Sequence, residues 1–241
     1  MFKSLNEFES TNCFIAYFDI LGYKSIVERG IYDKTLARVM ENVITKFRQY
    51  NEQANLISSE TQRLHMRIFS DNFIIYTDSD WGSLTDVVAL MQGQFSFDGV
   101  FVRGAMCYGK LYANNEFVFG KGLIDVVALE GEAMYPRIIV DDSFTDAVYS
   151  QEQSSTTLST YILSDGNINY VNYIKQYAEA CLSHSKIDFE WFLTNHRYFI
   201  VENIKAHASC EGVLKKYIWI KNYHNRYCEE NNYSKFIIAS R

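Results

Sequence analysis

Two aspartates in strand-like settings are the residues of this chain whose types and spacing most suggest chemistry. Asp19 ends the apolar run 13–18, and Asp71 lies in a polar turn between two short apolar runs. An unpaired buried carboxylate is costly, so an acid at the end of a buried strand is seldom there for stability. Two such acids on neighbouring strands predict a two-metal site for Mg²⁺ or Mn²⁺, of the kind used in phosphoryl transfer. The alternative is that each aspartate only caps a turn.

The turn after Asp19, residues Ile20–Lys24, is a candidate phosphate-binding segment. Backbone N–H groups at a turn that opens a helix bind phosphate oxygens. Gly22 would let the backbone approach closely, and Lys24 would add a positive charge. An ordinary tight turn is the competing interpretation.

The first 80 residues contain the elements that must position these groups. Residues 13–18 are expected to form a buried strand, and Asp33 is expected to cap an amphipathic helix that runs to about Gln53. The runs 64–69 and 73–77 predict a hairpin with its turn at residues 70–72. One helix and one strand between the two aspartates would bring Asp19 and Asp71 close together.

The next 60 residues continue the alternation of strands and helices. We expect a helix capped by Ser83 and broken at Gly99, and a strand over 100–107 with a turn at Tyr108 and Gly109. The remaining elements are a hairpin over 110–119, a helix over 123–134 and a strand over 137–140. The order predicts an α+β fold with a ferredoxin-like, palm-type β-α-β-β-α-β core and helices on one face of the sheet.

Residues 143–241 differ in character and are expected to form a mainly helical extension packed on a catalytic domain at 13–142. A turn at 165–167 separates two short strands, and the pattern is helical from Tyr173 onward. The aromatic residues of the tail are interpreted as packing residues rather than a base-stacking platform. They are Tyr217, Trp219, Tyr223 and Tyr227.

Composition limits the class of protein. The chain has 241 residues, of which 48% are hydrophobic, enough for a sizeable core. The net charge of −6 argues against a nucleic-acid partner, which needs a basic surface. Five dispersed cysteines predict reduced thiols rather than a disulfide framework. A polar N-terminus without a signal-peptide pattern, and no run long enough to span a bilayer, predict a cytoplasmic protein that does not enter membranes.

Several segments resemble class III nucleotidyl cyclases. Residues 18–23, Phe-Asp-Ile-Leu-Gly-Tyr, resemble the first metal motif of that family, and residues 69–73 resemble the second. Residues 102–109 are similar to the family's Arg-x-Gly strand, and residues 120–140 to its later helix and strand. Together these segments cover about 13–142 in the right order. The resemblance implies that Asp19, Ile20 and Asp71 hold the metals and that the backbone from Ile20 to Tyr23 holds the triphosphate.

The details are most similar to the bacterial pyrimidine cyclases of Pycsar anti-phage systems. That resemblance implies conversion of UTP or CTP to the 3′,5′-cyclic monophosphate, a homodimer with composite active sites, and a separate effector protein that binds the product. The aromatic helical tail adds to this likeness.

The chain departs from the purine cyclases at two places. Asp125 and Leu129 stand where those enzymes carry Asn and Arg on a helix, so the usual transition-state arginine is missing, and Arg103 or Arg137 is the candidate substitute. The position that reads the purine falls near Leu64 or His65, which suits a changed base pocket. Tyr23 is either a core residue or a filler beside the smaller base.

Rival hypotheses differ in what the fold would do. A non-catalytic nucleotide sensor would keep the fold without turnover. A palm-type polymerase or diguanylate cyclase would use similar acids, but the chain lacks a Gly-Gly-Asp-Glu-Phe-like turn and a basic template groove. A purely structural interaction module would bind no nucleotide.

Overall fold

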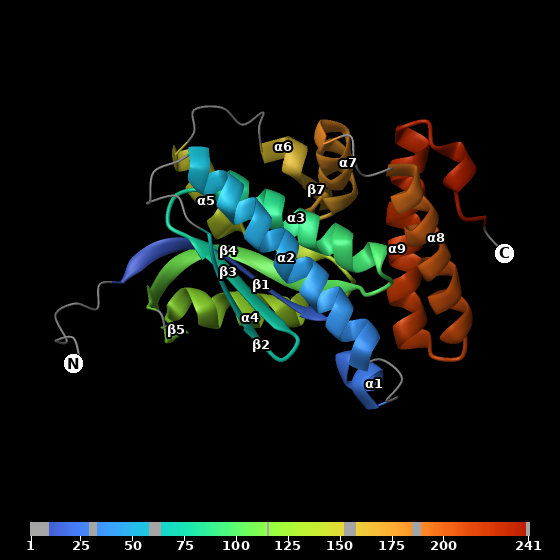
Figure 1. Cartoon of the computed structure of the whole chain (residues 1–241), viewed down its shortest axis with the longest axis horizontal. Helices are drawn as coiled ribbons and strands as arrows, with labels where there is room; N and C mark the ends of the chain where they lie inside the picture. The colour runs from blue at the N-terminus through green and yellow to red at the C-terminus, as the bar shows by residue number, and fades with distance from the viewer. Residues whose placement is uncertain are drawn as a thin grey trace.

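The computed structural model describes residues 10–28, 33–57, 64–114, 116–151, 158–184 and 189–239. Within them one mixed sheet of eight strands has the order β2-β3-β1-β4-β6-β8-β7, with β5 paired to β4 (Figure 1). The strands are β1 (Thr11–Ile20), β2 (His65–Phe69), β3 (Asn72–Thr77), β4 (Val102–Ala113), β5 (Val118–Phe119), β6 (Ile138–Val140), β7 (Ile162–Asp165) and β8 (Ile168–Val171). Neighbouring strands are antiparallel except for β4 and β6, which run parallel.

Helices connect and cover these strands. They are α1 (Tyr23–Glu28), α2 (Asp33–Ile57), α3 (Trp81–Phe97), α4 (Lys121–Glu132), α5 (Asp142–Gln151), α6 (Leu158–Tyr161), α7 (Tyr173–His184), α8 (Phe189–Ala206), α9 (Glu211–Glu230) and the 3₁₀ helix η3 (Ser234–Phe236). The α+β, palm-type fold predicted from the sequence is thereby confirmed. None of the helices in the described ranges is both long enough and apolar enough to cross a membrane.

Strand β1 lies at the centre of the sheet, between β3 and β4. Phe18 pairs with Phe73 of β3, and Asp19 pairs with Arg103 of β4. The predicted hairpin is present, and its turn joins β2 to β3 next to the end of β1. The strand that carries Asp19 therefore adjoins the hairpin that carries Asp71, as the order of elements predicts.

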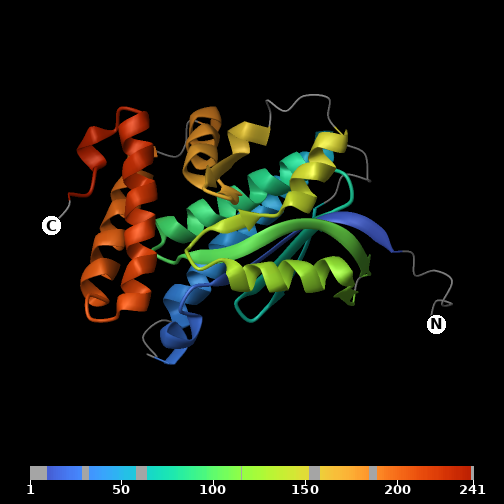
Figure 2. The same cartoon turned by 180° about the vertical axis from the view of Figure 1, so that it is seen from behind.

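Helices cover both faces of the sheet, whereas the sequence pattern predicted helices on one face. Helices α2 and α3 lie on one face, and α4 lies on the other (Figures 1 and 2). Phe14 and Phe18 of β1 pack with the main core on the α3 side, while Cys13 and Ile15 pack with α4. The reason is in β1 itself, because a continuously apolar strand has two apolar faces and each needs a cover.

Two local predictions were wrong. Asp80, not Ser83, caps α3, because its side chain accepts a hydrogen bond from the backbone N–H of Ser83. Gly109, predicted in a turn, lies inside β4. A Cβ there would come within 2.8 Å of the Cα of Gly122, so this glycine allows α4 to pack closely on the sheet.

Residues beyond 142 extend the same sheet and cover it. Strand β8 pairs with β6, and the turn between β7 and β8 contains Gly166 at φ 64°. Helix α7 packs on α3, and α8 and α9 form an antiparallel pair at one end of the sheet (Figures 1 and 2). Tyr217, Tyr223 and Tyr227 are buried, which confirms that they are packing residues. The division of the chain at residue 142 stays a prediction.

Candidate active site

Asp19 occupies the next-to-last position of β1, on the face that α4 covers. Cys13, Ile15 and Tyr17 alternate along the same face and pack with α4, so the two-residue period of the strand directs Asp19 to that side. Its side chain is 20% exposed. The carboxylate therefore lies at the margin of the core, where an entering ligand can reach it.

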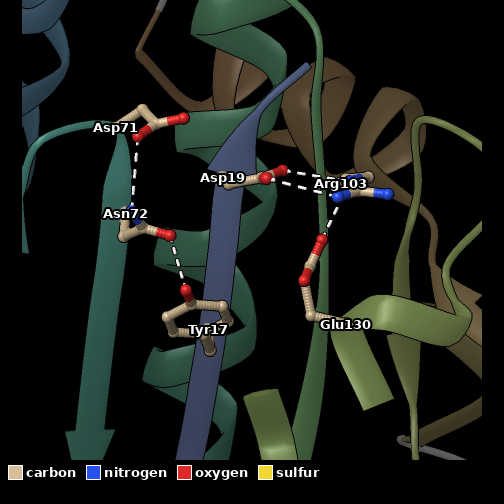
Figure 3. A network of polar contacts seen from close by, with 6 residues as sticks. All are labelled: Tyr17, Asp19, Asp71, Asn72, Arg103 and Glu130. Carbon is tan, nitrogen blue, oxygen red and sulfur yellow. Dashed lines mark hydrogen bonds and ion pairs between the residues drawn. The ribbon is translucent and has the colours of Figure 1, made fainter. Parts of the chain in front are cut away.

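Asp71 is the second residue of the two-residue turn between β2 and β3. Ser70, the first residue of this turn, has a positive φ of 58°. A short chain of hydrogen bonds ties this turn to β1 (Figure 3). The hydroxyl of Tyr17 donates to Oδ1 of Asn72, and Nδ2 of Asn72 donates to Oδ1 of Asp71 at 3.3 Å. Tyr17 and Asn72 were not singled out from the sequence, although their positions two residues from Asp19 and one from Asp71 offered a signal.

Arg103 links Asp19 to a second carboxylate, that of Glu130 on α4 (Figure 3). Its Nε lies 3.2 Å from Oδ1 of Asp19 and 2.8 Å from Oε1 of Glu130. Glu130 follows Val126 by four residues and therefore faces the sheet as Val126 does. That spacing is the sequence signal by which Glu130 could have been found.

Burial is the main cause of a raised pKa at two carboxylates of this corner, Asp19 and Glu130. Burial raises the pKa of Asp19, the hydrogen bond and charge of Arg103 lower it, and the charge of Asp71 raises it; the net shift is upward. Burial also raises the pKa of Glu130, and the charges of Asp19 and Asp71 add to that effect against the opposing Arg103. One guanidinium therefore leaves the corner with uncompensated negative charge.

A second cation comes from the C-terminal part of the chain. Lys216 of α9 is half-buried, and burial and the charge of Arg103 lower its pKa, while Asp19 and Glu130 raise it. Its neighbour Tyr217 packs its ring on Phe101, at 5.7 Å between centroids, just before β4. No local sequence pattern could place Lys216 here, because its position depends on how α9 packs on the sheet.

The predicted phosphate-binding turn, residues 20–24, is only partly open to a ligand. The backbone N–H of Leu21 donates to the carbonyl of Phe101 at 2.8 Å, so it is already engaged. Gly22 has φ 75° and open space around it. Tyr23 packs against the main core, and Lys24 is exposed and 3.7 Å from Glu28. Ile20 is buried and pairs with Val102 of β4.

The other predicted site residues lie away from the two aspartates. Asp125 forms an ion pair with Lys121 one turn earlier on α4. The guanidinium of Arg137 lies 5.4 Å from the ring centroids of Tyr135, Tyr170 and Trp219 and 3.3 Å from a carboxylate oxygen of Asp165. These contacts enclose the guanidinium of Arg137 and are typical of a packing residue. The guanidinium of Arg103, in contrast, contacts Asp19 and Glu130.

The donor set suits a hard divalent cation. In the part of the chain that the structure describes, no group of three or more His, Cys, Asp or Glu side chains is arranged to hold a metal ion. Asp19 and Asp71 nevertheless offer carboxylate oxygens, and a bound cation would favour the ionised form of Asp19, whose pKa burial raises. Mg²⁺ needs only one or two protein carboxylates when substrate phosphates complete its ligands. Asp19 and Asp71 would hold the ion.

Comparisons with known proteins identify the fold. No protein-family model matches the chain, and no curated protein sequence matches it either. Among solved structures, the catalytic core of a rhodopsin-guanylyl cyclase with converted specificity, in complex with ATPαS, superposes with a TM-score of 0.50 at 10% identity. The match covers 68% of this chain and 97% of that one. The chain has the class III nucleotidyl cyclase fold.

Two other matched structures have lower scores. The adenylyl cyclase CyaB from P. aeruginosa has a TM-score of 0.47 at 9% identity, over 68% of this chain and 95% of that one. A class III adenylyl cyclase-like ATP-binding protein from Pseudomonas aeruginosa has a TM-score of 0.46 at 11% identity, over 74% of this chain and 43% of that one. At these identities the likeness concerns the cyclase fold, and activity has to be argued from the residues.

Proposed function

We propose that this chain is a pyrimidine nucleotide cyclase that converts UTP to 3′,5′-cyclic UMP and pyrophosphate as a second messenger in anti-phage defence. The observation that supports it most is that the strand carrying Asp19 pairs with the hairpin whose turn carries Asp71, in a cyclase-fold sheet. Cyclic CMP made from CTP is the alternative product. A cytoplasmic location follows from such a role.

The proposed reaction is an intramolecular displacement. The 3′-hydroxyl oxygen of the ribose attacks the α-phosphorus, the bond to the oxygen bridging the α- and β-phosphates breaks, and the hydroxyl proton passes to water. A divalent cation, Mg²⁺ or Mn²⁺, when bound, supplies charge neutralisation for the triphosphate. Arg103 and Lys216 add positive charge beside Asp19, and Arg103 is the candidate for stabilising charge in the transition state.

The preference for a pyrimidine base rests on the sequence resemblance of residues 18–23 and 120–140 to the Pycsar cyclases. In the structure Leu64 is buried, and the ring of His65 stacks on that of Tyr76 at 5.1 Å. Both residues lie at the end of β2 far from Asp71. Within one chain they therefore lie apart from a base bound near Asp71, and in a composite site they could reach the base only from the second copy of the chain.

The proposed partners are a second copy of the chain and an effector protein that binds the cyclic nucleotide. The outer side of α4 supports the homodimer, because Ile124 and Val127 on it are 68% and 41% exposed and Met134 just beyond it is 67% exposed. Ile124 and Val127 lie on the same helix as Glu130. A partner seated there would adjoin the acidic corner, as a composite site requires.

Incubation of the purified protein with each ribonucleoside triphosphate and Mn²⁺, followed by mass identification of the product, tests the proposal. We expect cyclic UMP, and we expect Asp19→Ala and Asp71→Ala to abolish it while circular dichroism shows a folded chain. Asp146→Ala, at an exposed position of α5, is the matched control and should keep activity. Normal turnover by either aspartate variant would refute the site.

A nucleotide sensor without turnover is the second candidate. Two observations favour it: Leu129 packs into the sheet where purine cyclases carry their arginine, and Asp19 is engaged by Arg103. A sensor would show a nucleotide-dependent rise in the temperature of unfolding but no product in the same incubation. No thermal shift with any nucleotide would instead indicate an interaction module.

A further inference from the structure

Arg103 contacts two carboxylates that belong to different elements, β1 and α4. Asp19 lies directly opposite it in the β1–β4 register, and its two oxygens accept from Nε and Nη2 of Arg103 at 3.2 and 3.5 Å. Oε1 of Glu130 on α4 lies 2.8 Å from the same Nε and accepts no hydrogen bond. The side chains of Arg103, Asp19 and Glu130 are only 27%, 20% and 12% exposed, so water screens the three charges weakly.

The guanidinium occupies the side of Asp19 that faces away from Asp71. Figure 3 shows the carboxylate of Asp19 turned toward Arg103, with Asp71 on the opposite side of β1. A divalent cation shared by the two aspartates would need Asp19 to turn back toward Asp71. It would also repel the guanidinium, because both carry positive charge in a poorly screened corner. The cation and Arg103 therefore compete for Asp19.

Glu130 gives Arg103 a second position that does not depend on Asp19. Its oxygen is closer to Nε than the oxygens of Asp19 are, and it is fixed on a helix that packs on both β1 and β4. A guanidinium released by Asp19 would otherwise leave a buried, unpaired charge, which is strongly unfavourable. Glu130 removes that penalty and keeps Arg103 next to the site.

We propose that Arg103 is an internal counter-ion that a divalent cation displaces from Asp19, and that Glu130 is the positioning residue that retains the displaced guanidinium. The inference rests on the proposed function for the identity of the cation and the role of Asp19. It goes beyond that function because it describes the site without metal. In that state Asp19 forms an ion pair with Arg103, and a binding metal ion has to break this ion pair. Arg103 thus lowers the affinity of the site for metal, and Glu130 limits that loss.

Binding of Mn²⁺ without nucleotide, followed by the electron paramagnetic resonance signal of free Mn²⁺, tests the role of Arg103. Arg103→Gln should tighten binding about tenfold, within the usual range of coupling between two binding events. Lys205→Gln, which removes the same charge from an exposed ion pair with Glu202, is the matched control and should leave the affinity unchanged. Unchanged or weaker binding by Arg103→Gln would overturn the inference.

The role of Glu130 is tested by a double-mutant cycle in the same assay. Glu130→Gln should weaken Mn²⁺ binding, because Arg103 then depends on Asp19 alone. In the Arg103→Gln background the same substitution should have a much smaller effect. An equal loss in both backgrounds would mean that Glu130 contributes only general negative charge, which would overturn its positioning role.

Two further measurements separate this inference from the proposed function. Asp19→Asn should remove the Mn²⁺ site; if it binds as the wild type does, the metal assignment itself fails. If Asp19→Asn removes the site but Arg103→Gln changes nothing, only the inference fails. Should Arg103→Gln not fold, the wild type suffices: Mg²⁺ should shift the ¹⁵N resonance of Arg103 Nε, and an unmoved resonance counts against displacement.

Discussion

At the scale of single residues, the hairpin that carries Asp71 is held to β1 by polar side chains. Tyr17 and Asn72 connect the two through hydrogen bonds, and burial, followed by the charges of Glu130, Asp19 and Asp71, raises the pKa of the Tyr17 hydroxyl. That hydroxyl therefore stays protonated and remains a donor at neutral pH. The position of Asp71 thus depends on a residue that is not itself a proposed metal ligand.

Tyr17→Phe should impair the site more than the fold. The substitution keeps the ring that packs beside α4 but removes the donor to Asn72. We expect the free energy of unfolding to fall by about 1 kcal/mol, the usual worth of one hydrogen bond. Mn²⁺ titration of the product-forming rate should show a weaker apparent metal affinity.

Phe119→Leu at the exposed end of β5 is a suitable control for loss of aromatic surface on the α4 side of the sheet. Its ring stacks on that of Tyr112 at 5.0 Å, so some stability is lost, but the metal dependence of the rate should be unchanged. An unaltered metal dependence in Tyr17→Phe would mean that Asp71 is positioned by its own turn alone.

The sequence was sufficient to predict that the elements carrying Asp19 and Asp71 are neighbours, but not what surrounds the two aspartates. Asp19 ends a strand and Asp71 lies in the turn of a hairpin, and both elements have a local apolar pattern, so their adjacency could be predicted from the order of elements. Glu130 needed knowledge of which side of α4 faces the sheet, and Lys216 needed the packing of α9, a helix far along the chain from α4. Long-range packing of that kind leaves no periodic trace in the sequence.

At the scale of elements, a buried polar chain joins α7, α8, α9 and η3. The hydroxyl of Tyr173 lies 2.8 Å from Nε2 of His196, and Nδ1 of His196 lies 2.9 Å from Nδ1 of His224. Nε2 of His224 lies 3.1 Å from the carbonyl of Phe236, which can only accept. Nε2 of a neutral His224 therefore carries the proton, and His196 donates through Nδ1 and accepts from Tyr173.

This arrangement predicts loss of stability in mild acid. Burial lowers the pKa of His196 well below its ordinary value and that of His224 from 6.5 to about 4. At these two histidines the unfolded chain therefore binds more protons than the folded chain between those values, so their contribution to stability falls as pH decreases from 6.5 toward 4, while Asp86, whose pKa burial raises to about 6, acts in the opposite sense. Urea unfolding at several pH values should show this loss.

His224→Gln provides the comparison, because an amide can donate to Phe236 and accept from His196 without titrating. The pH dependence of its unfolding free energy should be flatter than that of the wild type over the same interval. Equal slopes would show that other groups cause the acid sensitivity.

At the scale of the whole molecule, residues beyond 142 share the core of the proposed catalytic domain. Tyr173, Ile174 and Tyr177 belong to the same buried cluster as Phe14 and Phe95. The sequence marked a change of pattern near residue 142, but a change of pattern does not show where packing stops. The predicted boundary at residue 142 marks a change of sequence pattern, whereas the hydrophobic core continues across it.

A chain that ends at residue 142 should therefore fail to fold on its own. It would expose β6 as an edge strand and uncover the side of α3 that α7 contacts. We expect aggregation on expression, or no cooperative thermal transition. A monomeric, cooperatively unfolding fragment would instead support 13–142 as an independent domain.

Helix α9 brings a positively charged residue of the C-terminal part near the proposed site. Leu21 and Phe101, at the ends of β1 and β4, pack in one cluster with Tyr217 and Ile220 of α9, and this places Lys216 within the field of Asp19 and Glu130. An ammonium so placed should attract the triphosphate without taking part in bond breaking.

Lys216→Gln should raise the KM for the nucleoside triphosphate about tenfold, as loss of one poorly screened charge contact implies, with a smaller change in kcat. Lys215→Gln, its exposed neighbour paired with Glu211, should behave as the wild type. If both variants keep the wild-type KM, α9 serves only to cover the end of the sheet.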